Sequence, residues 1–205
     1  VSDWSSDVCS SDLIDVTQIV NSETQPRYGE TEFLSVCTPD PLHAEQVIRG
    51  LDSGQKVFCE KPLCCTREEL TNIRCALETS VGTIGMNMPL RFATKFRRLK
   101  DSVDSGMFGH IYFIQLTYHW GRRHLLDAGW RKEMRAYFPM MGGGVHMVDL
   151  LIWLTGEEFV EIEPIAAGPI LQIGGLQTAT GFYAQVVADF GSDRGDHYHD
   201  VFVRG

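Results

Sequence analysis

The stretch Phe58-Cys59-Glu60-Lys61-Pro62 places an acid, a base and a proline directly after the apolar run that begins at Val57. We expect residues 56–59 to form a buried strand. A parallel strand delivers the residues that follow it into the crevice where α/β proteins bind ligands. Glu60 and Lys61 are therefore predicted to meet a cofactor or a substrate. The alternative is a surface salt bridge beside a turn-forming proline.

Strand and helix patterns alternate around this stretch. Thr66 is predicted to cap a helix, with Glu69 at the capping-box position. The predicted order is a strand over residues 33–37, a helix over 41–51, a strand over 56–59, a helix over 66–80 and a strand over 83–87. Such alternation is typical of an α/β fold, here part of a Rossmann domain, a doubly wound parallel sheet with right-handed crossovers.

The pattern changes after residue 92. We expect a basic helix over residues 95–104, a strand over 110–120, an apolar helix over 145–154 ended by Gly156, and strands over 181–190 and 201–203. These elements predict a second α/β domain with a large open, mostly antiparallel sheet that lines a substrate site. The expected division is residues 14–92 and 93–205, and residues 1–13, a near-repeat of Ser-Ser-Asp, are expected to be non-native.

Composition excludes several functional classes. The chain has 205 residues, a formal charge of -9 and 43% hydrophobic residues, so we expect no binding to nucleic acid or to an anionic membrane. No apolar run is long enough to span a bilayer and no signal peptide is evident. The six cysteines suggest no disulfide framework and suit a reducing compartment. We therefore expect a cytoplasmic protein.

Four motifs together resemble a known family. They are Thr38-Pro39-Asp40-Pro41-Leu42-His43, then Glu60-Lys61-Pro62, then Pro89-Leu90-Arg91-Phe92, and then Gly142-Gly143-Gly144-Val145-His146-Met147-Val148-Asp149. In order and spacing they resemble the Gfo/Idh/MocA family of NAD(P)-dependent oxidoreductases. The resemblance implies a dehydrogenase that transfers a hydride between NAD or NADP and a secondary alcohol of a sugar, cyclitol or related polyol.

The resemblance also implies roles for individual residues. Lys61 and His146 are the catalytic candidates, because an amine or imidazole of tuned pKa can take the hydroxyl proton. Glu60 would orient the lysine or meet the cofactor ribose, and Pro62 would fix the strand exit, often through a cis peptide in this family. The full set expected at the cofactor is Thr38, Pro39, Asp40, His43, Glu60, Lys61, Pro62 and Arg91.

His146 and Asp149 are spaced i, i+3 on the predicted helix and share one face. The alternative is that His146 is a packed core histidine and Asp149 satisfies a buried polar neighbour. Many members of the family carry an aspartate one turn before the histidine, where this chain has Gly142. The family's Asp-His proton relay is therefore in doubt, which leaves Lys61 with His146 to carry the proton.

Aromatic and cationic residues between these motifs suit a pocket for a polyol or a sugar phosphate, or else form a solvated loop. With Asp149, the expected substrate residues are Tyr118, Arg122, Arg123, His124, Trp130 and Arg131. His197 and His199 would face the same site. Together with His146 and Asp149 they would make a metal-dependent hydrolase only if all four converged, and we expect no metal.

The sequence contains no Gly-x-Gly-x-x-Gly turn, and residues 14–32 are too few for the unit that cradles the cofactor pyrophosphate. We therefore expect a fragment of a longer enzyme, with weak affinity for NAD and no activity as it stands. A second hypothesis is a non-catalytic ligand-binding or regulatory relative of the same fold. The expected partners are a small sugar-like substrate and a second copy, bound through the open sheet.

Overall fold

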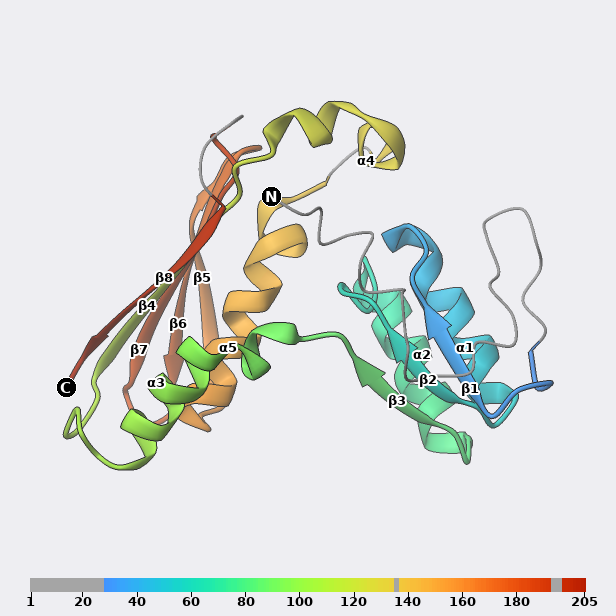
Figure 1. Ribbon diagram of the computed structural model, residues 1–205, viewed down its shortest axis with the longest axis horizontal. Helices are drawn as coiled ribbons and strands as arrows, with labels where there is room; N and C mark the ends of the chain where they lie inside the picture. The colour runs from blue at the N-terminus through green and yellow to red at the C-terminus, as the bar shows by residue number, and fades with distance from the viewer. Residues whose placement is uncertain (1–27, 135–136, 193–196) are drawn as a thin grey trace.

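The computed structural model describes residues 28–134, 137–192 and 197–205, so the expectations for residues 1–13 lie outside the described part. Two sheets lie side by side, each covered by helices (Figure 1). The fold class predicted from the sequence is confirmed: a Rossmann-like parallel sheet precedes a mixed, mostly antiparallel sheet. No helix of the described ranges is long and apolar enough to cross a membrane.

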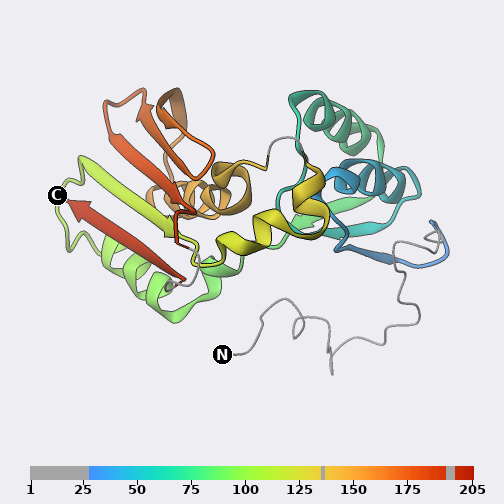
Figure 2. The same cartoon turned by 90° about the horizontal axis from the view of Figure 1, so that it is seen from above.

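The first sheet contains three parallel strands in the order β1-β2-β3. Its elements are β1 (Phe33–Val36), α1 (His43–Asp52), β2 (Lys56–Cys59), α2 (Arg67–Thr79) and β3 (Thr83–Met86). Both helices cover the same face of the sheet (Figure 2). Val36, Val57 and Cys59 point into the core beneath these helices together with Val47 and Leu51. Alternate side chains of β1 and β2 are therefore buried, which explains their apolar sequence.

The helix boundaries follow local signals. The Thr66 side chain accepts from the Glu69 amide, and the Glu69 carboxylate accepts from the Thr66 amide, so the predicted capping box is confirmed. The helix predicted from residue 41 is wrong in its first turn: Asp40–Leu42 form a 3-10 turn, η1, and α1 begins at His43. Pro41 stands in that turn, where the missing amide hydrogen costs nothing.

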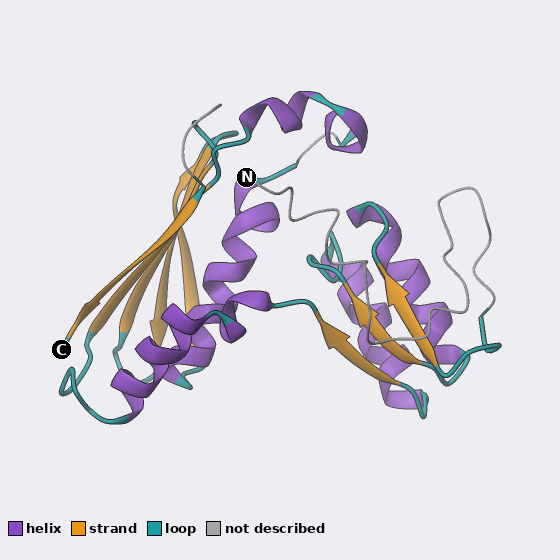
Figure 3. Cartoon of the chain, in the orientation of Figure 1, coloured by secondary structure: helices purple, strands orange, loops and turns teal. Residues whose placement is uncertain are grey.

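The second sheet has the order β5-β6-β7-β4-β8. Its strands are β4 (Phe113–His119), β5 (Phe159–Ala167), β6 (Leu171–Thr178), β7 (Tyr183–Asp189) and β8 (Tyr198–Arg204). The β4–β7 pair is parallel, and the other three pairs are antiparallel. Helices α3 (Thr94–Asp104) and α5 (Val145–Thr155) lie on the face turned towards the first sheet, as the purple helices of Figure 3 show.

The sequence analysis did not predict β5 and β6. β5 is an edge strand that exposes Val160, Ile162 and Ile165. Val160-Glu161-Ile162-Glu163 alternates apolar and charged residues, but Pro164 interrupts the run, and the pair Gly174-Gly175 weakens the strand pattern of β6. The sheet therefore contains two strands, β5 and β6, that the sequence did not predict.

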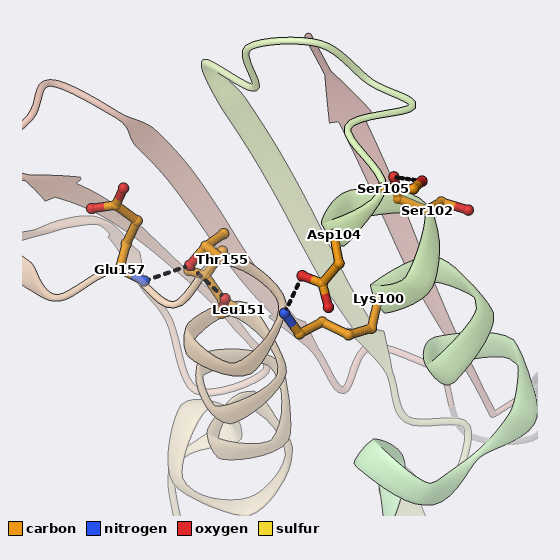
Figure 4. A network of polar contacts seen from close by, with 7 residues as sticks. All are labelled: Lys100, Ser102, Asp104, Ser105, Leu151, Thr155 and Glu157. Carbon is orange, nitrogen blue, oxygen red and sulfur yellow. Dashed lines mark hydrogen bonds and ion pairs between the residues drawn. The ribbon is translucent and has the colours of Figure 1, made fainter.

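The carboxyl ends of α3 and α5 lie beside each other and are closed by short-range polar contacts (Figure 4). Gly156 ends α5 with φ of 70°, as the sequence predicted, and its amide donates to Ile152 O. The other contacts are Lys100 Nζ to Asp104 Oδ1 at 2.5 Å, Ser105 Oγ to Ser102 O at 3.0 Å, Thr155 Oγ1 to Leu151 O at 2.9 Å and Glu157 N to Thr155 Oγ1 at 3.2 Å. Each of these contacts stays within its own helix and the residues that follow it, so they end α3 and α5 locally.

Candidate active site

The loops that follow β1 and β2 are joined by His43. Its ring is buried, with Nδ1 2.7 Å from Pro62 O and Nε2 2.7 Å from Thr38 O. Thr38 Oγ1 donates to Gln46 Oε1 on α1, and Pro39 O accepts from the Leu42 amide in the first turn. Both nitrogens of His43 face backbone oxygens, so its role in this structure is to align the two loops. Thr38, Pro39, His43 and Pro62 are thus brought to one edge of the sheet, as predicted for parallel strands.

Glu60 lies between β1 and β3. Its amide donates to Val36 O, and its Oε1 accepts from Asn87 Nδ2 at 2.6 Å. Asn87, the first residue after β3, donates its own amide to Cys59 O. Asn87 was not among the site residues predicted from the sequence. It follows a parallel strand as Glu60 does, so the same argument could have predicted it. The side-chain amide of Asn87 thus holds the Glu60 carboxylate beside the Lys61 backbone. Lys61 N lies 3.3 Å from Glu60 Oε2.

Lys61 connects the first sheet to the second domain. Its Nζ donates to Gly142 O at 2.9 Å, a contact between residues 81 positions apart, and the Lys61-Pro62 peptide is cis. Burial lowers the pKa of Lys61 below its ordinary value, while the Asp40 and Glu60 carboxylates oppose this shift and Arg131 adds to it. The amine is thus easier to deprotonate than a solvent-exposed lysine.

Asp40 carries a buried carboxyl group whose charge acts on Lys61. It is 6% exposed, and its Oδ2 has no hydrogen-bond partner within the described residues. Burial raises the pKa of Asp40, against the opposing charges of Lys61, His43 and Arg131. A buried carboxyl oxygen without a donor in the protein remains available to accept a hydrogen bond.

His146 lies in the first turn of α5 and is 9% exposed. Its ring stacks on Tyr118 with centroids 6.0 Å apart, and Nδ1 has no hydrogen-bond partner among the described residues. Burial, assisted by the charges of Lys61, His199 and His197, lowers the pKa of His146 to about 3. The imidazole is therefore neutral near pH 7.

Tyr118 is surrounded by three histidines. The His197 and His199 rings approach it edge-on at 5.1 and 4.9 Å, and the Tyr118 hydroxyl lies 3.4 Å from His197 Nε2. Within the ranges that the structure describes, no three His, Cys, Asp or Glu side chains are arranged to hold a metal ion. His146, His197 and His199 therefore form an aromatic cluster around Tyr118. Asp149 does not join this cluster, because it pairs with Arg91.

Asp149 pairs with Arg91. Arg91 Nε donates to Oδ2 at 2.8 Å and Nη2 to Oδ1 at 2.5 Å, a bidentate contact between the 3-10 turn Pro89–Phe92 and α5. The Asp149 side chain is 14% exposed. The two residues, predicted to bind cofactor and substrate respectively, satisfy each other in this structure and link the two domains.

The aromatic and cationic residues predicted to bind substrate lie in different places. Arg123 and His124 are exposed on the 3-10 turn Arg123–Asp127. Burial raises the pKa of Tyr118, against the charge of Arg122, and burial lowers the pKa of His197, with the charge of Arg122 adding to that shift. Trp130 and Arg131 belong to α4 (Gly129–Glu133), which reaches towards α1 above the gap between the sheets (Figures 1 and 2).

Tyr137 occupies the space beside Gly142. A Cβ atom at Gly142 would lie 2.3 Å from the Tyr137 hydroxyl oxygen and 2.6 Å from Cζ. Gly142 belongs to a π-helical turn, Met140–Gly144, that leads directly into α5. No local signal in the sequence could have selected Tyr137, because its importance comes from the residue that it contacts.

Two family models match the chain. The model for the oxidoreductase family with an NAD-binding Rossmann fold matches residues 5–87, and the model for the GFO/IDH/MocA C-terminal domain matches residues 96–196. The chain therefore belongs to the Gfo/Idh/MocA family of oxidoreductases. The resemblance drawn from four short motifs is confirmed.

The similar proteins are dehydrogenases. D-glucoside 3-dehydrogenase of Escherichia coli (strain K12) is 28% identical over 148 residues, 70% of this chain and 40% of the relative. Inositol 2-dehydrogenase of Pseudomonas syringae pv. syringae (strain B728a) is 25% identical over 139 residues, 66% of this chain and 39% of the relative. The crystal structure of scyllo-inositol dehydrogenase from Lactobacillus casei with NAD(H) and scyllo-inositol has a TM-score of 0.74 at 17% identity, covering 87% of this chain and 56% of that one. The chain thus spans less than half the length of these two curated relatives.

Proposed function

We propose that this chain is part of an NAD(P)-dependent dehydrogenase that acts on a secondary alcohol of a sugar, a cyclitol or a related polyol. The observation that carries the proposal is Lys61, an amine of lowered pKa held between the end of β2 and the turn before α5. The names of the relatives, a glucoside dehydrogenase and an inositol dehydrogenase, support the substrate class.

The residues at the strand ends fit a nicotinamide dinucleotide. The unpartnered Oδ2 of Asp40 and the Glu60 carboxylate are acceptors of the kind that ribose hydroxyls and a carboxamide require. Thr38, Pro39, Asp40 and Glu60 would hold the group. When bound, NAD(P)+ accepts the hydride that leaves the carbinol carbon.

Lys61 takes the hydroxyl proton in this proposal. In its neutral form the amine has a lone pair for that proton, while its N–H continues to donate to Gly142 O. The alcohol then loses one hydride and one proton and becomes a carbonyl. A base works best when its pKa lies near the working pH, and burial moves Lys61 in that direction.

His146 has a different role from Lys61. With a pKa of about 3 it is a poor proton acceptor at neutral pH. Its neutral ring, held against Tyr118, can exchange a hydrogen bond with the substrate hydroxyl and orient it towards Lys61. We therefore assign proton transfer to Lys61 and positioning to His146.

Cofactor titration followed by turnover tests this function. Nicotinamide fluorescence measures NADH and NADPH binding, and the weak affinity expected from the missing glycine-rich turn would be contradicted by micromolar binding. At saturating NAD+ or NADP+, the full-length protein is then assayed for reduced nicotinamide with a panel that includes myo-inositol and D-glucose. In that protein Lys61→Met should lower kcat/KM by roughly 10²- to 10⁴-fold, the usual share of general base catalysis. Lys56→Met, which alters an exposed lysine at the start of β2, the strand that precedes Lys61, is the control.

The second candidate is a non-catalytic ligand-binding relative. It is favoured by Gly142, which stands where many members carry an aspartate, and by Tyr137, which fills the adjacent space. Substrate-panel compounds that bind without turnover at saturating cofactor would support it. Turnover that Lys61→Met leaves unchanged would refute the assignment of the base.

We also propose a cytoplasmic location and an oligomer formed through the open sheet. The five described cysteines are free thiols, which suits a reducing compartment. Val160, Ile162 and Ile165 are exposed on edge strand β5, which supports a contact with a second copy. Sedimentation of the chain tests whether it forms this oligomer.

A further inference from the structure

Two aromatic rings hold the guanidinium of Arg131. Its Cζ lies 4.4 Å from the ring centroid of Trp130 and 5.6 Å from that of Tyr137. The Tyr137 hydroxyl also accepts a hydrogen bond from Arg131, and the Trp130 and Tyr137 rings meet edge to face at 5.8 Å. These contacts keep the planar group in one orientation, although α4 itself has only five residues.

One donor of this oriented group has no acceptor. Arg131 Nε is buried and lacks a hydrogen-bond partner in the described part of the chain, and no ion pair found there includes Arg131. A buried N–H that lacks an acceptor destabilises the folded state. The arrangement therefore points to an acceptor other than the residues that the structure describes.

The charges around Arg131 indicate what kind of acceptor it is. Arg131 acts electrostatically on Lys61, on Asp40 and on Tyr118, so it belongs to the same site as the proposed base. Lys61 donates to a neutral carbonyl oxygen. Burial raises the pKa of Asp40, and the Asp40 and Glu60 carboxyl groups both act on Lys61. No ion pair of the described residues joins either carboxyl group to Arg131, so neither is shown to be its acceptor.

We propose that Arg131 binds an anionic oxygen group, a carboxylate or a phosphate, carried by the sugar-like substrate beside Lys61. A guanidinium fork matches the oxygens of both groups, and an anionic oxygen would accept the hydrogen bond of Nε while pairing with the Arg131 charge. The inference rests on the proposed function for the sugar-like body of the ligand. It narrows the substrate from a neutral polyol to an acidic sugar.

Binding without turnover tests the inference. Calorimetric titrations of the chain with D-glucuronate, D-glucose 6-phosphate and D-glucose compare two anions with their neutral parent. At least one anion should bind more tightly than glucose, and Arg131→Gln should weaken that anion roughly 10- to 100-fold while leaving glucose unchanged. Lys132→Gln, which removes an exposed cation from the same helix, should leave all three unchanged.

Two controls accompany this test. Circular dichroism shows whether each variant is folded, and Arg131→Lys is a second variant at the same position. The lysine keeps the charge but loses the fork, so an intermediate affinity in a folded variant supports bidentate binding. A preference for glucuronate identifies a carboxylate, and a preference for glucose 6-phosphate identifies a phosphate. Equal affinity for all three sugars, or no binding of any, overturns the inference. Since no turnover is required, anion binding by a chain that never reduces NAD+ would refute the dehydrogenase while leaving the Arg131 site intact.

Discussion

The contact between Gly142 and Tyr137 can be tested by adding one methyl group. In Gly142→Ala the new Cβ would lie 2.3 Å from the Tyr137 hydroxyl oxygen, 2.6 Å from Cζ and 2.7 Å from Cε1, all well inside contact distance. Tyr137 cannot simply swing away, because its ring packs against Trp130 and Phe190 and is bonded to Arg131. Overpacking of this kind costs about 1–3 kcal/mol of unfolding free energy.

A double-mutant cycle separates this clash from other effects of the substitution. Tyr137→Ala alone should destabilise the chain, because a half-buried aromatic ring is lost, by up to about 3 kcal/mol. In the double variant the methyl group has room, so the two costs should fall short of additivity by about 1–3 kcal/mol. Urea unfolding followed by tryptophan fluorescence measures all four proteins, with an unchanged m-value as the condition for comparison.

Gly85→Ala is the matched control. Its Cβ would meet the Phe58 ring at 3.6 Å, an ordinary contact, so its stability should change by no more than about 0.5 kcal/mol. Costs at Gly142 and Tyr137 that add without coupling would show that Tyr137 does not fill this space. The account of why the chain carries glycine at position 142 would then be wrong.

Three further predictions concern buried charge. Lys61→Met should stabilise the chain at pH 7 in urea unfolding, because the unfolded state binds the lysine proton more tightly. The gain should shrink as pH rises towards 10.5, and a gain independent of pH would contradict the lowered pKa. His146 has a pKa of about 3 in the folded state against 6.5 unfolded, so wild-type stability should fall as pH drops below 6.5, by at most about 1.4 kcal/mol per pH unit. Thermal unfolding of His146→Asn should show a shallower acid limb, and an identical limb would place the titration elsewhere. Arg91→Ala leaves the Asp149 carboxylate unpaired and, since Arg91 is partly exposed, should cost about 1–2 kcal/mol in urea unfolding, whereas Arg91→Ala/Asp149→Ala should cost less than the sum of the single changes.

Signals that act over a few residues were readable in the sequence. The capping box of Thr66 and Glu69 and the left-handed Gly156 depend on contacts with near neighbours, and both are found where the pattern put them. Edge strand β5 was missed although Val160-Glu161-Ile162-Glu163 alternates apolar and charged residues, because Pro164 interrupts the run and proline is tolerated only in an edge strand. Whether a strand lies at the edge of a sheet is decided by the tertiary structure.

The sequence by itself determined the alternation of strands and helices, the polar residues at the strand ends and the family. Each of these is written in neighbouring residues or in the order of short motifs. Only the tertiary structure decided that Lys61 donates to Gly142 and that Tyr137 fills the space beside that glycine. It likewise decided that Arg91 pairs with Asp149 and that β4 lies parallel to β7. Apart from Tyr137 and Gly142, which meet through the turn between them, these contacts join residues far apart in the chain, so no local pattern records them.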